Sequence, residues 1–244
     1  MSMRLDKYLV EENLASSRQR AQDLIKGGHV KVGDVVMTKP AAEVDVSDKI
    51  TLLKSDLPYV SRAALKLKAL LEAVEVNLMG AIVLDVGAST GGFTQVCLEE
   101  GSHKVYALDV GTGQLKELLK GDPRVVNMAQ TDARDIQTDM FDPVPTVLVS
   151  DVSFISVTKA LDVALRILPI ERLFVLIKPQ FELSPHQIGK GGLVKDEAAQ
   201  KQAVEKVEAF VHAHGFETGK ILPSPVKGGD GNQEYLLYAT RGRE

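Results

Sequence analysis

The chain has 244 residues, of which 44% are hydrophobic and 25% charged, which is enough for one large domain and a small one. The net charge of −4 argues against a generally basic surface for nucleic acid, so any such contact must come from local patches. The single cysteine, Cys97, excludes an internal disulfide, and the five histidines lack metal-ligand spacing, so we expect no metal site.

The first 55 residues are predicted to form a small α+β module. Helices are expected at residues 4–10 and 18–26, the second preceded by an N-cap at Ser16–Ser17 and ended by Gly27–Gly28. Short strands are expected at 29–32, 35–37 and 49–52. A module of this size is marginal alone but feasible.

Basic residues gather on the second of these helices and on the strand that follows. Arg18, Arg20, Lys26 and Lys31 face only one acid, Asp23, in this stretch. Together with the partial positive charge of the helix N-terminus they make a candidate surface for phosphate groups. An ordinary solvated helix face is the alternative.

The wider pattern of these residues is more specific. It begins with Arg4-Leu5-Asp6-x-x-Leu9 and continues through Ser16, Ala21, Ile25, Gly28, Val30, Val32 and Gly33. This pattern resembles the S4 RNA-binding domain over about the first 55 residues. We expect RNA contacts from Arg4, Arg18, Arg20, Lys26, Lys31, Arg62 and Lys190.

A connector at residues 56–60, containing Asp56-Leu57-Pro58, is expected to separate this module from a second domain at 61–244. The second domain opens with a helix at 61–72, for which Ser61 is a natural N-cap. Leu67, Leu70 and Leu71 form its apolar stripe.

Strand-like and helix-like segments then alternate. Strands are expected at 81–86, 104–109, 125–128, 146–150, 173–177, 215–222 and 233–239. Helices are expected at 92–100, 114–120, 156–168 and 195–214. The alternation predicts a doubly wound, mostly parallel α/β sheet of seven strands, with the last two as an antiparallel hairpin.

A glycine-rich turn at residues 87–92 follows the first of these strands. Its spacing, Asp85-x-Gly87-x-x-x-Gly91-Gly92, fits neither the dinucleotide fingerprint nor a triphosphate loop. Asp85 would repel a pyrophosphate but suits a cationic ligand end, such as the amino and sulfonium groups of S-adenosylmethionine (SAM). Asp109 ends the next strand about 20 residues later, where a carboxylate can bind a ribose diol. An ordinary α/β turn is the alternative.

This arrangement resembles motif I of the class I SAM-dependent methyltransferases, whose Rossmann-like fold it therefore implies. We expect cofactor contacts from Asp85, Gly87, Ala88, Ser89, Gly91, Gly92, Phe93, Asp109, Val110, Asp132, Ala133 and Asp151. Asp132 would accept a hydrogen bond from the adenine amino group.

Further charged residues stand at strand ends: Asp151 after the fourth strand, Lys178 after the fifth, and Glu234 in the last. A single charged residue at such a position usually has no function and lies there because the strand has reached the solvent. Ligands of open α/β sheets, however, gather at this edge. Lys178 follows an apolar run and should be partly buried, which favours the neutral amine that a general base requires.

Lys66, Asp151, Lys178 and Glu234 match the catalytic tetrad of the FtsJ-like ribose 2′-O-methyltransferases. An S4 domain joined to such a domain resembles the TlyA (haemolysin A) family, of which the segments 151–156 and 178–182 are also characteristic. The resemblance covers essentially the whole chain. It implies SAM-dependent methylation of a cytidine 2′-hydroxyl in RNA of the small ribosomal subunit, the large one, or both.

In this interpretation Lys178 is the base, Lys66 holds the ribose or phosphate, and Asp151 and Glu234 position both lysines. The acids favour charged amines, so the tetrad is one coupled system. Alternatively, positioning dominates and the proton leaves to water. The basic loop 187–195 is either a mobile connection or a segment that closes over RNA, and the loop 227–232 would serve the same rim.

Other functions remain open from the sequence: a non-catalytic ribosome-assembly factor, or a membrane-damaging haemolysin, which no apolar or amphipathic stretch supports. A base methyltransferase lacks its motifs here, and Cys97 is misplaced for a nucleophile. With no signal peptide evident, we expect a cytoplasmic monomer that binds ribosomal RNA or subunits and no membrane.

Overall fold

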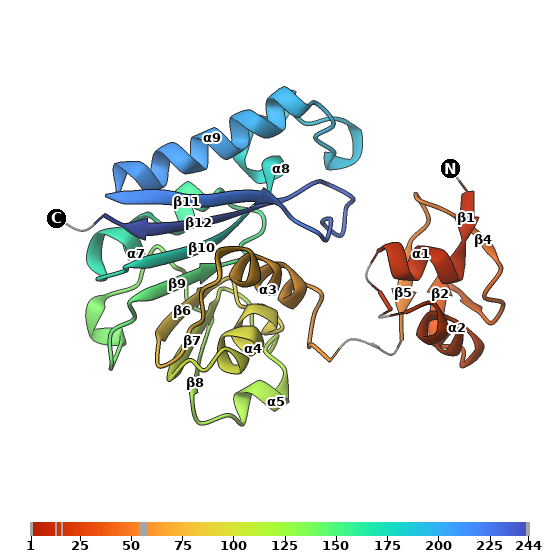
Figure 1. Cartoon of the computed structure of the whole chain (residues 1–244), viewed down its shortest axis with the longest axis horizontal. Coiled ribbons are helices and arrows are strands. Elements are labelled where there is room, and N and C mark those ends of the chain that lie inside the picture. The colour runs from red at the N-terminus through yellow and green to blue at the C-terminus, as the bar shows by residue number, and fades with distance from the viewer. Residues whose placement is uncertain (1, 13, 16, 54–57, 243–244) are drawn as a thin grey trace. The chain divides into compact units, whose positions relative to one another are not determined.

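The computed structural model describes residues 2–12, 14–15, 17–53 and 58–242. The chain separates into two compact units, Met1–Arg62 and Ala63–Glu244 (Figure 1). Ser16 and the first two residues of the expected connector, 56 and 57, lie outside the described residues. The predicted domain limits therefore stay a prediction.

The first unit is a small α+β fold. Its elements are β1 (Ser2–Arg4), α1 (Leu5–Glu11), α2 (Arg18–Lys26), β2 (Val30–Val32), β3 (Val35–Met37), β4 (Glu43–Asp45) and β5 (Ile50–Leu52). The sheet β3-β2-β5 is antiparallel, and β1 pairs with β4. Ser17 caps α2 by accepting from the Arg20 amide at 3.3 Å. Both predicted helices and three strands are confirmed. The pair β1–β4 was not predicted, because runs of three residues carry too little alternation.

The second unit is built on a seven-stranded sheet. Its strands are β6 (Ile82–Val86), β7 (Lys104–Asp109), β8 (Val125–Ala129), β9 (Val147–Ser150), β10 (Arg172–Ile177), β11 (Phe216–Pro223) and β12 (Tyr235–Arg241). Their order is β11-β12-β10-β9-β6-β7-β8. The strand β12 runs antiparallel to both β10 and β11, and the remaining pairs are parallel. The predicted fold class, including the antiparallel hairpin, is confirmed.

Helices cover both faces of this sheet. They are α3 (Ala63–Val74), α4 (Gly92–Glu99), α5 (Glu117–Lys120), α6 (Val157–Ala160), α7 (Asp162–Ile167), α8 (Pro179–Glu182) and α9 (Glu197–Ala213). Leu84 and Val86 of β6 face the core shared with α6, α7 and α9, whereas α3 and α4 pack together on the other face (Figure 1). Among the described residues, no helix combines the length and apolarity needed to cross a membrane.

Two expected helices differ from the structure, and one helix was not expected. The helix expected at 156–168 is two short ones, which meet at the fully buried Leu161 (φ −99°, ψ −11°). The helix expected at 114–120 begins only at Glu117, since Gln114 instead accepts a hydrogen bond from the Ser89 hydroxyl at 2.9 Å. The short helix α8 was not predicted.

The sheet places the predicted site residues on one edge. The strands β6, β7, β9 and β10 are parallel, so their carboxyl ends meet there. Tyr235 pairs with Ile177, the last residue of β10. Glu234 and Lys178 therefore stand on adjacent strands at the same edge.

Candidate active site

The glycine turn between β6 and α4 is shaped by its own packing. Gly87 (φ +84°) and Gly91 (φ +99°) have backbone conformations that favour glycine. A Cβ on Gly87 would lie 2.9 Å from the Asp151 carbonyl oxygen, and one on Gly91 would lie 2.2 Å from the side chain of Leu119. Gly87 thus brings the turn against the segment that begins at Asp151, and Gly91 brings it against the side chain of Leu119 in α5.

Asp85 is completely buried in β6, on the face covered by α4. One carboxylate oxygen accepts from the Thr94 hydroxyl at 2.6 Å, and the other has no hydrogen-bond partner within the described chain. Burial raises the pKa of Asp85 to about 7, and the charges of Asp151 and Asp109 add to the effect. The structure therefore holds Asp85 under the turn, where an adjacent cation would stabilise its ionised form.

Asp109 closes the turn from the end of β7. Its carboxylate accepts from the amides of Ser89 and Gly111, each at 2.8 Å. Ser89 itself has a left-handed backbone (φ +49°). Each carboxylate oxygen keeps a second lone pair, so Asp109 can still receive a ribose diol.

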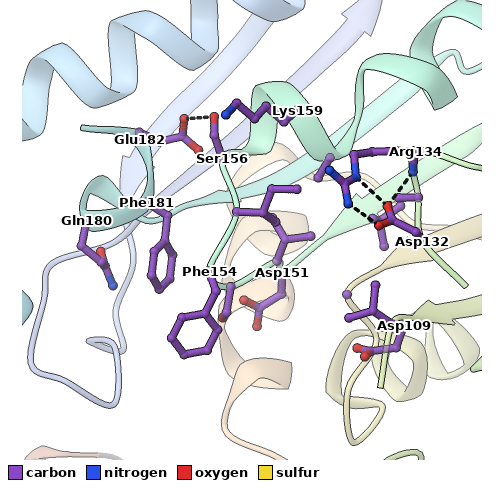
Figure 2. Close-up of a pocket in the computed structure, with 18 of the residues that line it drawn as sticks. Asp109, Asp132, Arg134, Asp151, Phe154, Ser156, Lys159, Gln180, Phe181 and Glu182 are labelled. Carbon is purple, nitrogen blue, oxygen red and sulfur yellow. Dashed lines mark hydrogen bonds and ion pairs between the residues drawn. The ribbon is translucent and has the colours of Figure 1, made fainter. Parts of the chain in front are cut away.

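A cavity of about 1150 Å³ opens at this edge of the sheet. It extends from Asp109 past Asp151 to Glu182 (Figure 2). Of the expected cofactor residues, those that line it are Gly87, Ser89, Asp109, Val110, Asp132, Ala133 and Asp151. Those outside its lining are Asp85, Ala88, Gly91, Gly92 and Phe93. Contact of either group with a cofactor stays a prediction.

Asp132 is occupied by a neighbour that sequence reasoning missed. The Arg134 guanidinium binds both of its carboxylate oxygens, at 2.9 and 2.6 Å (Figure 2). These hydrogen bonds lower the pKa of Asp132. A ligand amino group would have to share Asp132 with Arg134, which also lines the cavity. The spacing of one residue between an acid and an arginine is the only sequence signal for this pair.

The four residues of the predicted tetrad form two buried ion pairs. Lys66 of α3 binds Glu234 at 2.5 Å, and Lys178 binds Asp151 at 2.7 Å. The Lys178 amine also donates to the Ser153 hydroxyl at 2.7 Å. Lys66, Lys178 and Glu234 are exposed by only 7, 9 and 2%, so each of these charges depends on its partner.

The two pairs act on one another electrostatically. Burial raises the pKa of Glu234, against the opposing charge of Lys66. The charge of Lys178 lowers it as well, and that of Asp151 raises it. The structure thus brings the four residues into one electrostatic cluster, of which Asp151 alone also lines the cavity.

Phe154, between Asp151 and Ser156, is an unusual residue that the sequence did not single out. It is 92% exposed and has φ +64°, a conformation that a bulky residue rarely adopts. Its ring lies 5.2 Å from that of Phe181 (Figure 2). Strained, exposed aromatic residues concentrate at functional sites. Phenylalanines that follow buried strands are ordinarily expected in the core, so the sequence does not predict this pair.

In the first unit, two of the expected RNA-binding arginines share one acid. Arg4 and Arg18 bind the fully buried Asp6 at 2.9 and 3.1 Å, and Gln22 donates to it as well. Hydrogen bonds from Arg4, above all, hold the pKa of Asp6 well below its usual range. Asp6 thereby fixes the two guanidinium groups at a partly exposed surface.

The other expected RNA-binding residues differ in setting. Arg20 and Lys26 of α2 are exposed, and Lys31 of β2 is half-buried. Arg62 donates to the Glu12 carbonyl at 3.1 Å. Lys190 is exposed on the 3₁₀ turn Lys190–Gly192 of the second unit. Among the described residues, no cluster of His, Cys, Asp and Glu could hold a metal ion.

Comparisons with known proteins extend over both units. Residues 59–241 match the FtsJ-like methyltransferase family, and residues 3–50 match the S4 domain. The chain is 41% identical over 238 residues to Hemolysin A of Brachyspira hyodysenteriae, covering 97% of this chain and 99% of that protein.

A second relative has a named reaction. The chain is 38% identical over 237 residues to the 16S/23S rRNA (cytidine-2′-O)-methyltransferase TlyA of Mycobacterium tuberculosis, covering 96% of this chain and 88% of that protein. Among solved structures, a protein of Streptococcus thermophilus provisionally named a hemolysin aligns with a TM-score of 0.76 at 34% identity. That alignment covers 100% of this chain and 90% of the other.

Proposed function

The chain belongs to the TlyA (haemolysin A) family of FtsJ-like methyltransferases, and from this premise we propose that it methylates the 2′-hydroxyl of a cytidine ribose in ribosomal RNA. The methyl donor is SAM. Its fit rests on the donor set of the cavity, where carboxylates suit both a ribose diol and a cationic end. When bound, SAM supplies a methyl group on a positively charged sulfur, which leaves as a neutral thioether.

The position of Asp151 is the observation that carries the proposal. Asp151 lines the cavity and also pairs with Lys178 at 2.7 Å. The ligand site and the buried lysine are therefore joined through one carboxylate. A nucleotide entering the same cavity would place its ribose beside the amine that can accept or direct a proton.

The residues divide the chemistry as follows. A ribose hydroxyl is a weak nucleophile, so its oxygen must be held in line and its proton accepted as it reacts. Lys178 is the proposed base, in its neutral form, and Ser153 and Asp151 fix the direction of its amine. Glu234 holds Lys66, which would contact the ribose or its phosphate.

An alternative assigns the tetrad a positioning role only, with the proton leaving to water. The ion pair between Lys178 and Asp151 favours this version, because a nearby carboxylate stabilises the charged amine. The two versions differ in pH dependence. A base that must be neutral gives a rate that rises with pH up to its titration, whereas pure positioning does not.

The first unit is proposed to bind ribosomal RNA as an S4 domain at residues 1–55, followed by a linker at 56–60 and the methyltransferase domain at 61–244. Support comes from the match of residues 3–50 and from the arginines fixed by Asp6. We propose a monomer, since the tetrad is complete within one chain. The proposed site of action is the cytoplasm, where ribosomal subunits are found.

The proposal is tested by methyl transfer from labelled SAM to purified 30S subunits, 50S subunits and free rRNA. We expect wild type to label at least one of them, in nucleotides that resist alkaline cleavage, and Lys178→Ala to be inactive while still binding SAM. The matched control is Lys201→Ala, which removes a lysine whose side chain is 76% exposed on α9. No transfer by wild type to any substrate, with RNA binding intact, would instead support a non-catalytic assembly factor.

A further inference from the structure

Glu182 is a buried acid that lies outside the tetrad. It is the last residue of α8, four positions after Lys178, and is only 6% exposed. Its carboxylate accepts from the Ser156 hydroxyl at 2.5 Å and from the Val157 amide at 2.6 Å. Both groups stand at the start of α6, where Ser156 is the N-cap.

These contacts connect the two segments that carry the Lys178–Asp151 pair. The segment 151–157 follows β9, and the segment 178–182 follows β10, its parallel neighbour. At one end the two segments are joined by Lys178 and Asp151. At the other end they are joined by Glu182 and Ser156 (Figure 2). Between these two connections lies Phe154 with its left-handed backbone, a conformation that persists only where the surroundings hold it.

A cation from a third element completes the arrangement. Lys206 of α9 pairs with the Glu182 carboxylate at 3.1 Å and donates to the Glu182 carbonyl at 2.7 Å. The charge of the buried acid is therefore compensated by a cation. The Glu182 carboxylate contacts Ser156, Val157 and Lys206, which are structural partners. These contacts indicate a role in geometry rather than in proton transfer.

We propose that Glu182 is a positioning residue for methyl transfer: by fixing residues 151–157 against the segment that begins at Lys178, it sets the geometry of the Lys178–Asp151 pair. The inference rests on the proposed function. Displacement of a reacting group by about 1 Å costs as much as ~10²-fold in rate. Loosening this connection should therefore lower kcat without weakening the binding of SAM or RNA.

The principal variant is Glu182→Gln, which keeps the volume and one acceptor but removes the charge bound by Lys206 and Ser156. The control is Tyr106→Phe, which removes a hydroxyl that accepts from the Asp142 amide at 2.8 Å and donates to the Pro143 carbonyl at 2.9 Å. It disturbs a part-buried hydrogen-bond network away from the site. Steady-state kcat and KM for SAM and for subunits are measured below the melting temperature of every variant.

We expect Glu182→Gln to lower kcat by roughly tenfold or more, while the KM for SAM and the KM for subunits each change by less than about threefold. Tyr106→Phe should leave kcat near the wild-type value. In a double-mutant cycle with Ser153→Ala, which removes the acceptor of the Lys178 amine, the losses should be less than multiplicative. A purely structural role for Glu182 would lower the melting temperature and leave kcat unchanged, and the cycle with Ser153→Ala would then show no coupling.

A kcat for Glu182→Gln equal to that of Tyr106→Phe would overturn the inference while leaving the proposed function intact. An inactive wild type would overturn the proposed function itself. If Glu182→Gln does not fold, Ser156→Ala decides, because it removes the hydroxyl that donates to Glu182 and caps α6 but keeps the ion pair of Glu182 with Lys206. A lowered kcat at constant KM then supports the inference, and an unchanged kcat refutes it.

Discussion

Replacing Asp85 by Asn should make the second unit more stable at neutral pH and change how its stability depends on pH. Asp85 is fully buried, and one of its oxygens has no hydrogen-bond partner in the described chain. An amide has nearly the same shape and carries no charge to bury. The variant therefore isolates the cost of ionising this one side chain.

The magnitude follows from the two pKa values. Burial raises the pKa of Asp85 to about 7 from a reference value of 3.8, so between these values the native state binds the proton more tightly than the unfolded one. The stability contributed by the protonated form is complete below the unfolded pKa and is lost as pH rises through about 7. Between pH 5 and pH 7 wild type should lose about 2 kcal/mol through this group, and Asp85→Asn should lose none of it.

The single cysteine provides the assay. Cys97 is completely buried in α4, so its reaction with a thiol reagent reports the opening of the second unit specifically. The free energy of opening is measured for wild type and Asp85→Asn at pH 5, 6, 7 and 8, with unfolded protein as the reference for intrinsic thiol reactivity. The stability of the variant minus that of wild type should grow by about 2 kcal/mol from pH 5 to pH 7.

A difference that stays constant from pH 5 to pH 7 would refute the reasoning, because it would mean that Asp85 titrates alike in both states. Thr94→Val gives an independent check. It removes the hydroxyl that lowers the pKa of Asp85, so the loss of stability should extend to higher pH than in wild type. Asp85→Asn thus removes this pH dependence, whereas Thr94→Val extends it to higher pH.

Three further outcomes are expected. Glu234→Ala leaves the Lys66 amine buried without its partner and should lower the free energy of unfolding by ~3–5 kcal/mol. The double variant Glu234→Ala/Lys66→Met should recover most of this loss, and calorimetry measures both. Asp6→Asn releases two arginines and should accelerate amide hydrogen exchange in α1 and α2 of the whole protein but not in α9; uniform exchange rates would contradict it. Arg134→Ala frees the carboxylate of Asp132, so titration calorimetry should show tighter SAM binding; weaker binding would instead assign Arg134 itself a contact with the cofactor.

Much of the fold was predictable because its signals are local. The apolar runs and glycine turns fixed the order of strands and helices, and the rule that ligands gather at strand ends brought Asp151 and Lys178 to one edge. The grouping of Lys66 and Glu234 in one tetrad came only from the family resemblance, since 168 residues separate them. Their ion pair still required the structure to be seen.

The features that could not be predicted from the sequence depend on the direction of side chains and on the packing of loops. Strand alternation puts Leu84 and Val86 on one face of β6, and Asp85 therefore points under α4 rather than to the mouth of the turn. The contact between Glu182 and Ser156 joins loops whose relative position no spacing rule gives. Ordinary loop composition hid the left-handed backbone of Phe154.

The strand β12 lies between β10 and β11, yet it follows every other strand of that sheet in the sequence. On a translating ribosome, Lys66 is therefore made 168 residues before Glu234. Until β12 emerges, β10 presents an unpaired edge and β11 has no strand to join. The nascent chain therefore acquires the complete cluster of Lys66, Asp151, Lys178 and Glu234 only when the segment leading into β12 is made.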